Sequence, residues 1–270
     1  MDALITSALV FALGAAMGSF INVVAYRLPA GQSLLYPGSH CPRCGHALTA
    51  YDNVPILAWL WLSGRCRYCR GSIARRYPLT ELGCGLLFLV SFWRLGWSWW
   101  IPAHWVFLSL LLSLALIDLD TLTLPDRLTQ PGLVAGLVAQ GLIPSLQGEA
   151  LASVLTAMMG GVFGAVLGLW LYEVISLLAS LALGQAALGG GDAKLAAMLG
   201  AWLGWQGLLL SSFLACALGA LLGGGAIALG WLQRRQPMPF GPFLAIGGGL
   251  TVGWGKELIH FYQSLFLPAL

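Results

Sequence analysis

Charged residues are scarce in this chain. Of its 270 residues, only 9% are Asp, Glu, Lys or Arg, whereas 59% are hydrophobic. A soluble globular domain carries roughly 25% charged residues, so this deficit excludes an ordinary soluble domain and predicts an integral protein of the lipid bilayer. The net charge is only +3. The chain also lacks a basic patch with interleaved aromatic residues, which argues against a nucleic-acid partner.

A basic segment is missing ahead of the first apolar stretch. Residues 3–24 are apolar, Asp2 precedes them, and the first basic residue, Arg27, follows them. A cleaved signal peptide has the opposite order, so we expect a membrane helix here. Seven of the thirteen Lys and Arg residues lie between positions 27 and 76. By the positive-inside rule, this stretch is expected in the cytoplasm.

Long apolar stretches make up most of the remaining sequence. A membrane-spanning helix needs roughly 20 apolar residues, and the pattern predicts an all-α polytopic membrane protein with about eight transmembrane helices and both termini outside. The expected spans are 3–25, 79–97, 102–118, 129–147, 151–173, 193–206, 207–232 and 243–262. The chain is thereby divided into a first transmembrane helix (1–25), a small cytoplasmic loop domain (26–78) and a transmembrane domain (79–270).

Four of the six cysteines form two CxxC pairs in the polar loop. Cys41 and Cys44 are separated by 21 residues from Cys66 and Cys69. Each CxxC turn directs two thiolates toward one point, and two such turns supply the four ligands of a closed, structural zinc site. The same ligands also suit iron, and disulfide bonds are an alternative that a reducing cytoplasm disfavours. His46 lies close to Cys44 and is interpreted as a surface histidine, because four sulfur ligands are already present.

Two aspartates stand at the ends of apolar runs. Asp118 follows residues 102–117, and Asp192 follows three consecutive glycines, 189–191. Ionisable residues in such places are expensive to keep and indicate function. If the two carboxyl groups converge, one can take a proton from an attacking water while the other polarises a peptide carbonyl. The pair therefore indicates an aspartyl protease, and a transporter that relays protons or cations is the alternative from another class.

Other polar residues near this pair have several interpretations. Asp126 is expected to cap the helix that follows it, and Asp120 points to another face than Asp118 if that stretch is helical. Lys194 is expected either to hold the Asp192 carboxylate or to contact lipid headgroups. Glu173 lies in or near a span and is interpreted as an interfacial anchor or as a contact for substrate or methyl donor.

Several groups of residues follow one another in a characteristic order. They are Gly18 to Pro29, the cysteine loop from Ser39 to Glu81, Asp118 to Asp126, Gly189 to Leu195, Gly200 to Trp205, and Pro239 to Pro242. In this order they resemble the bacterial type IV prepilin peptidases, which are leader peptidases and N-methyltransferases with a GxGD motif. The resemblance covers most of residues 16–245. Members of this family often have an acidic residue and Met ahead of the glycines, where this chain has Gln-Ala-Ala-Leu at 185–188.

The resemblance implies a two-step activity. Such an enzyme cleaves the leader of type IV prepilins or pseudopilins after a glycine and then methylates the new N terminus with S-adenosylmethionine. Asp118 and Asp192 would be the catalytic pair, and the four cysteines a structural Zn²⁺ site. The protein would be a multi-pass protein of the bacterial inner membrane, with its active site facing the cytoplasm, serving type IV pili or type II secretion. A peptidase without methyltransferase activity is the alternative within the family.

The methyl-donor site has no recognisable motif in this sequence. The chain lacks the glycine-rich turn of a dinucleotide-binding βαβ unit, so a donor would have to bind at the cytoplasmic loop and the adjoining helix ends. Asn22, Arg27 and Glu81 are the predicted donor-binding residues. Further candidates are Asp52, Asn53 and Tyr77. Each of these residues has the alternative role of bracing the cysteine loop.

Overall fold

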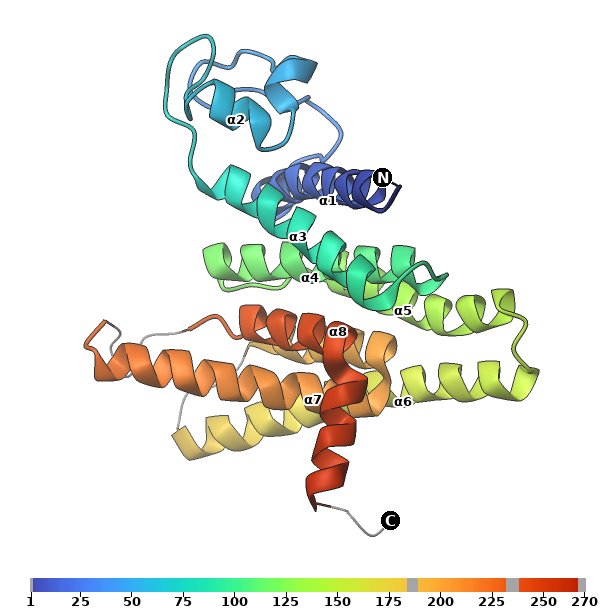
Figure 1. Cartoon of the computed structure of the whole chain (residues 1–270). Coiled ribbons are helices and arrows are strands. Elements are labelled where there is room, and N and C mark those ends of the chain that lie inside the picture. The colour runs from blue at the N-terminus through green and yellow to red at the C-terminus, as the bar shows by residue number, and fades with distance from the viewer. Residues whose placement is uncertain (1, 184–188, 232–237, 267–270) are drawn as a thin grey trace. The chain divides into compact units, whose positions relative to one another are not determined.

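The protein is all-helical in its described parts. The computed structural model describes residues 2–183, 189–231 and 238–266 (Figure 1). Within these ranges the chain forms eight α-helices and one short 3₁₀ helix, and it contains no β-strand. The predicted all-α fold is therefore confirmed. The chain divides into two compact units, Met1–Trp97 and Ser98–Leu270.

The first unit is a helix pair with a polar loop between its two members. The helices α1 (Asp2–Arg27) and α3 (Arg76–Leu95) pack along each other. The loop that joins them contains the 3₁₀ helix η1 (Ala50–Asn53) and the five-residue helix α2 (Leu57–Trp61). The predicted loop domain is therefore an insertion between two apolar helices, and it contains all four cysteines of the CxxC pairs.

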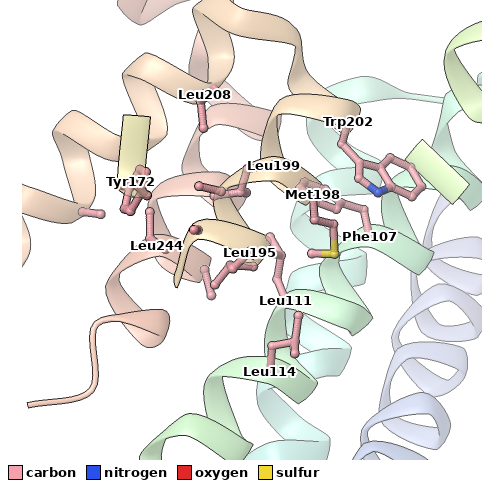
Figure 2. Close-up of a cluster of buried hydrophobic side chains, with 14 of the residues drawn as sticks. Phe107, Leu111, Leu114, Tyr172, Leu195, Met198, Leu199, Trp202, Leu208 and Leu244 are labelled. Carbon is pink, nitrogen blue, oxygen red and sulfur yellow. The ribbon is translucent and has the colours of Figure 1, made fainter. Parts of the chain in front are cut away.

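The second unit consists of five longer helices. They are α4 (Trp100–Thr121), α5 (Asp126–Leu146), α6 (Leu151–Leu183), α7 (Gly190–Ala228) and α8 (Gly241–Phe266). Side chains from all five helices, α4 to α8, meet in one buried hydrophobic cluster (Figure 2). Within this cluster the ring of Phe107 in α4 stacks on Trp202 in α7, with the ring centroids 4.9 Å apart. The indole N–H of Trp202 donates to the carbonyl of Gly132 in α5 at 2.8 Å, which attaches that helix as well.

Five of the described helices are long and apolar enough to cross a membrane, namely α1, α3, α4, α6 and α7. The chain is accordingly a multi-pass membrane protein. The predicted number of eight spans stays a prediction. Helix α5 carries Pro131 and Pro144 in its interior. Helix α6 runs without a break to Leu183, beyond the expected end of the span at residue 173.

Helix α7 consists of two helical segments joined at a kink. Gly204 has φ 68° and ψ 178°, a backbone conformation that residues with a side chain rarely adopt. This kink lies close to the predicted boundary between spans 193–206 and 207–232. The two predicted helices are therefore present, but they follow each other directly within one element.

Candidate functional site

The two predicted aspartates continue helix faces that contribute to the same buried hydrophobic cluster. In α4, Leu111, Leu114 and Asp118 are spaced three and four residues apart, so they lie on one face of the helix. In α7, Asp192 and Leu195 are likewise three residues apart. Leu111, Leu114 and Leu195 all belong to the same buried cluster (Figure 2). Both helices pack against α8, and Asp118, near the end of α4, interacts electrostatically with Asp192, near the start of α7.

Asp118 is held at the C-terminal end of α4. The helix ends where Leu122 adopts a left-handed conformation, with φ 53°, and donates its N–H to the Asp118 carbonyl at 2.9 Å. The side chain is 5% exposed. Its Oδ2 accepts a hydrogen bond of 2.9 Å from the backbone N–H of Gly241, the first residue of α8. A buried carboxyl group with a backbone donor is a defined, immobilised group rather than a solvated surface acid.

Asp192 lies in the first turn of α7, directly after the glycines. Its side chain is 8% exposed and interacts electrostatically with Asp118. The preceding Gly191 packs so closely on the segment that follows α4 that a Cβ there would lie 2.8 Å from the Cβ of Leu124. The glycine thus allows the start of α7 to approach the end of α4, which places the two aspartates within one site.

The other predicted polar residues lie outside this pair. Lys194 donates to Oδ1 of Asp126 at 2.6 Å, so Lys194 pairs with Asp126 instead of Asp192. The expectation that Asp126 caps its helix is wrong. Pro125 holds the cap position, and Asp126 is the first helical residue, where its carboxylate faces a lysine. This ion pair is exposed on both sides, and such pairs contribute little stability.

A groove of about 300 Å³ lies between α6 and the start of α7, and its lining includes the chain neighbours of Asp192 (Gly189, Gly190 and Ala193) but not Asp192 itself. One wall is a strip of α6 with the polar side chains of Tyr172, Glu173, Ser176 and Ser180, and the other wall is the start of α7. Tyr172 is buried, and its hydroxyl donates to Ser212 Oγ at 3.0 Å. Glu173, by contrast, is exposed. Backbone without side chains at Gly189 and Gly190 leaves room for an extended peptide next to the aspartate.

The four loop cysteines form one cluster in the first unit. Their Sγ atoms all lie within 4.8 Å of one another, and none is in a disulfide; the four residues are Cys41, Cys44, Cys66 and Cys69. The two CxxC turns have matching backbone bonds: Cys41 N–H donates to His46 O, and Cys66 N–H donates to Gly71 O. His46 is not part of the cluster. Its ring lies 3.5 Å from that of Tyr68, centroid to centroid.

The cluster has the dimensions of a tetrahedral metal site. A zinc ion with metal–sulfur bonds of about 2.3 Å requires sulfur–sulfur distances of about 3.8 Å, and the Cys41 and Cys69 sulfurs are 3.8 Å apart. Backbone hydrogen bonds from Cys44 and Arg43 lower the pKa of the Cys41 thiol to about 6, whereas, against the lowering effect of a backbone hydrogen bond from His46, burial and the neighbouring cysteines raise the pKa of the Cys44 thiol to about 11. Metals bind the thiolate, so the Cys41 thiol is already in a suitable state near neutral pH. The four cysteines can therefore hold a metal ion.

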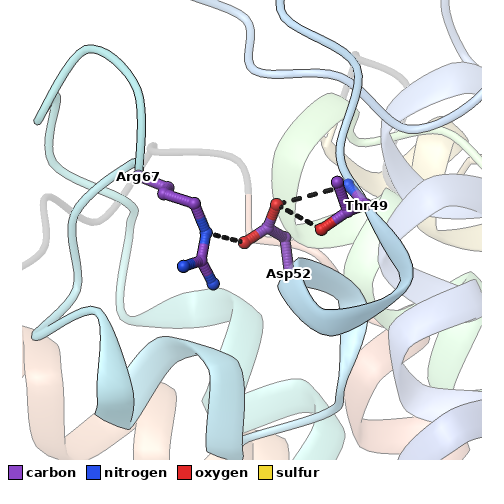
Figure 3. Close-up of polar contacts among 3 residues, drawn as sticks. All are labelled: Thr49, Asp52 and Arg67. Carbon is purple, nitrogen blue, oxygen red and sulfur yellow. Dashed lines mark hydrogen bonds and ion pairs between the residues drawn. The ribbon is translucent and has the colours of Figure 1, made fainter.

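A buried carboxylate braces the second CxxC turn against η1 (Figure 3). Oδ1 of Asp52 accepts a bond of 2.7 Å from Arg67, and its Oδ2 accepts bonds from the N–H and the hydroxyl of Thr49 at 3.2 and 2.8 Å. The Asp52 side chain is 2% exposed. Arg67 holds the pKa of Asp52 below its ordinary value. The carboxylate thus joins both halves of the cysteine loop.

Asp52→Asn is expected to loosen the cysteine loop. The substitution removes the charge that attracts Arg67 and one acceptor of Thr49, so a metal ion bound by the four cysteines should be released to a chelator about fivefold faster. Because folding lowers the pKa of Asp52, the stabilising effect of its carboxylate is complete above the unfolded pKa and decreases as the pH falls toward the lowered folded pKa. The ratio of the two release rates should therefore decrease with falling pH over the range in which the thiolates still hold the metal. Asp126→Asn, an exposed acid of the other unit, should release the metal like wild type at every pH. A pH-independent difference would contradict the assignment.

Comparison with known proteins gives this arrangement a context. Residues 12–95 match the Bacterial Peptidase A24 N-terminal domain, and residues 105–224 match the Type IV leader peptidase family. The chain is 40% identical to the prepilin leader peptidase/N-methyltransferase of Aeromonas salmonicida (strain A449), over 96% of this chain and 94% of that protein. The chain belongs to the type IV leader peptidase family.

Further members of the family show the same degree of similarity. Proteins with the same name from Stutzerimonas stutzeri and Pseudomonas aeruginosa (strain PAO1) are each 38% identical, over 93% of this chain and 91% of their own length. No solved structure matches this chain. The matched ranges therefore lie in both units: the four loop cysteines fall within residues 12–95, and both aspartates fall within residues 105–224.

The predicted methyl-donor residues all make hydrogen bonds to backbone groups of the first unit. Asn22 donates to the carbonyl of Tyr77 at 3.2 Å. Glu81 Oε2 accepts the N–H of Ile56 at 2.6 Å, and the Arg27 guanidinium donates to two loop carbonyls at 3.1 and 3.2 Å. All three side chains are buried. These bonds correspond to the bracing role, and the binding of a methyl donor by these residues stays a prediction.

Sequence reasoning missed two residues that contact the site of this leader peptidase family member. Gly241 belongs to the motif Pro239 to Pro242, which indicates no role for it, although its N–H donates to Asp118. Tyr172 has no motif at all and is recognised only from its burial beside Asp192. The family departure at positions 185–188 lies outside the described residues.

Proposed function

We propose that this chain is a membrane aspartyl endopeptidase that cleaves the leader peptide of type IV prepilins or pseudopilins after a glycine, and that it then methylates the new N terminus. The relatives carry both activities in their name. The observation that carries the peptidase proposal is the electrostatic interaction of Asp118 with Asp192, two buried acids from distant parts of the sequence, with an open groove along the residues that flank Asp192.

We propose a direct attack of water for the hydrolytic step. The ionised member of the pair removes a proton from water, and the resulting hydroxyl adds to the peptide carbonyl carbon. The protonated member donates a hydrogen bond to the carbonyl oxygen. The C–N bond then breaks, and the leaving nitrogen receives a proton from the carboxyl pair. Two neighbouring carboxyl groups share a single proton readily, because two adjacent negative charges repel each other.

The groove beside Asp192 is the proposed position of the substrate backbone. The wall formed by the start of α7 has no side chains at Gly189 and Gly190, so a peptide in extended conformation can approach. The exposed Glu173 and the serines of α6 offer polar contacts along the chain on either side of the scissile bond. A helical substrate must unwind locally to lie there, since a helix engages its own backbone groups.

We propose that the four cysteines hold a structural Zn²⁺ and that residues 26–78 serve the methyl transfer. The metal would join the two CxxC turns, in a loop that has too little apolar surface for a stable core of its own. S-adenosylmethionine supplies the methyl group when it is bound. Asn22, Arg27 and Glu81 are the proposed residues around it, because they lie where the loop adjoins the ends of α1 and α3.

The proposed location is the bacterial inner membrane, with the active site at the cytoplasmic side. The support is the distribution of basic residues, which concentrates on the loop domain. A leader peptide that has not crossed the membrane would be accessible on that side. Residues 79–270 are proposed as the peptidase domain, within which α4, α7 and α8 position the two aspartates.

Mass spectrometry of the processed pilin tests the two-step activity. The purified protein in lipid, given a prepilin and S-adenosylmethionine, should release the leader and leave a mature pilin heavier by one methyl group. Without S-adenosylmethionine, cleavage should continue and the added mass should be missing. A mature product that never gains the methyl mass would show a peptidase alone, and an intact prepilin would refute the proposed function.

A further inference from the structure

We propose that Gly241, the first residue of α8, is a positioning residue that orients the Asp118 carboxylate for hydrolysis. The proposal rests on the proposed peptidase function. It assigns a role to the start of α8, which lies far from both aspartates in the sequence. Three observations lead to it: the hydrogen bond to Asp118, the use of the other N–H groups in the same turn, and the space around the glycine.

The hydrogen bond connects α8 directly to the site. The N–H of Gly241 donates to Oδ2 of Asp118 at 2.9 Å in a buried setting. The terminal torsion of an aspartate side chain is broad, so its own rotamer preference does not define where the two oxygens point. A backbone donor from a packed helix defines it. With Oδ2 engaged, the other oxygen, Oδ1, remains for water or for Asp192.

The remaining N–H groups of this turn are used elsewhere or absent. The first N–H groups of a helix have no partner within the helix. Pro242 has no N–H, and the N–H groups of Phe243 and Leu244 donate to the carbonyl of Phe240 at 3.1 and 3.2 Å. Gly241 therefore supplies the N–H of the first turn that points at the carboxylate. The positive end of the helix dipole acts at the same place.

The site leaves no space for a side chain at position 241. A Cβ built on Gly241 would lie 2.7 Å from Oδ2 and 3.1 Å from Cγ of Asp118. The glycine is thus required by the close approach of the carboxylate, and its backbone does not have a positive φ. Any other residue would have to push the carboxylate out of its position.

The start of α8 is itself anchored next to the candidate site. Phe240 packs on Tyr172 of α6, with ring centroids 6.3 Å apart, and on Phe243 at 6.4 Å. Tyr172 in turn bonds to Ser212 of α7. The donor N–H is therefore carried by a support that involves three helices, as a group that must hold a reacting side chain requires.

Gly241→Ala tests this role, with Gly253→Ala as the matched control. Displacement of a reacting group by about 1 Å lowers the rate about 100-fold, so Gly241→Ala should lower kcat about 100-fold with KM changed less than about twofold. At Gly253, further along the same helix, a Cβ meets nothing within 4 Å. Gly253→Ala should keep both constants. A merely structural defect would instead lower the thermal stability and the fraction of active protein. The folded molecules would then keep the wild-type kcat and KM.

A second replacement removes the donor without adding an atom that clashes. Glycolic acid incorporated at position 241 replaces the backbone N–H by an oxygen, so it adds no Cβ. It should lower kcat about tenfold or more, as expected for the loss of a hydrogen bond to a charged group. This variant decides the question if Gly241→Ala does not fold. Wild-type kcat in the glycolate variant, or in a folded Gly241→Ala protein, would overturn the positioning role. A wild-type protein that leaves the prepilin intact would refute the peptidase proposal instead, and cleavage retained by Asp118→Asn would show that Asp118 is not catalytic, so these failures are distinguishable from that of the positioning role.

Discussion

Asp118→Asn and Asp192→Asn are each expected to lower prepilin cleavage by at least about 10³-fold. Asparagine has the size and shape of aspartate and can accept the Gly241 N–H, so the buried site can keep its packing. It can neither remove a proton from water nor share one with its neighbour. Because the reaction needs one ionised and one protonated carboxyl group at the same time, the single acid that remains cannot supply both roles.

The measurement is the cleavage rate of a prepilin by each purified variant in lipid, together with the fraction that is folded. Asp126→Asn is the matched control, because Asp126 is an exposed acid that pairs with Lys194 and thereby joins α5 to α7. It should cleave at close to the wild-type rate. Full activity in the Asp118 or the Asp192 variant would show that the acid is not catalytic.

Cys66→Ser is expected to remove the metal from the cysteine loop. A serine hydroxyl is a poor replacement for a thiolate, and the remaining three sulfurs form an incomplete tetrahedron. Metal binding and the folding of a small loop are coupled. The content of zinc should fall from about one ion per chain to a small fraction of that, and the other three thiols should become reactive toward alkylating reagents.

Cys216→Ser provides the control for this substitution, because Cys216 is exposed and belongs to the other unit. It should keep its zinc. Methylation should fall more than cleavage in Cys66→Ser, since the aspartates lie in the unit that does not contain the loop. A wild-type protein that contains no metal and has four reactive loop thiols would contradict the zinc assignment.

The roles of Lys194 and Arg27 illustrate why polar residues were difficult to place from the sequence. Lys194 is two residues from Asp192, yet it extends to Asp126 on another helix. Arg27 was expected at a methyl donor, and its guanidinium bonds two carbonyls of the loop. A long, charged side chain can reach several partners. Which partner it meets depends on how neighbouring helices pack, and this is not a property of the local sequence.

The sequence by itself determined the elements and the cysteine cluster. Helix formation and the CxxC turns depend on residues close together in the chain, so apolar length and cysteine spacing suffice to predict α1, α3, α4 and the four-sulfur cluster. The kink in α7 was also anticipated as a boundary.

Only the tertiary structure decided which groups meet at the candidate active site. The helices of this protein are apolar on most sides, so the pattern of apolar residues does not indicate which face packs on which neighbour. The approach of Asp118 to Asp192 follows from the packing of both α4 and α7 against α8, and the same position of α8 places the Gly241 N–H at Asp118. These contacts join residues far apart in the chain, and their geometry arises from the shapes of whole helices packed together.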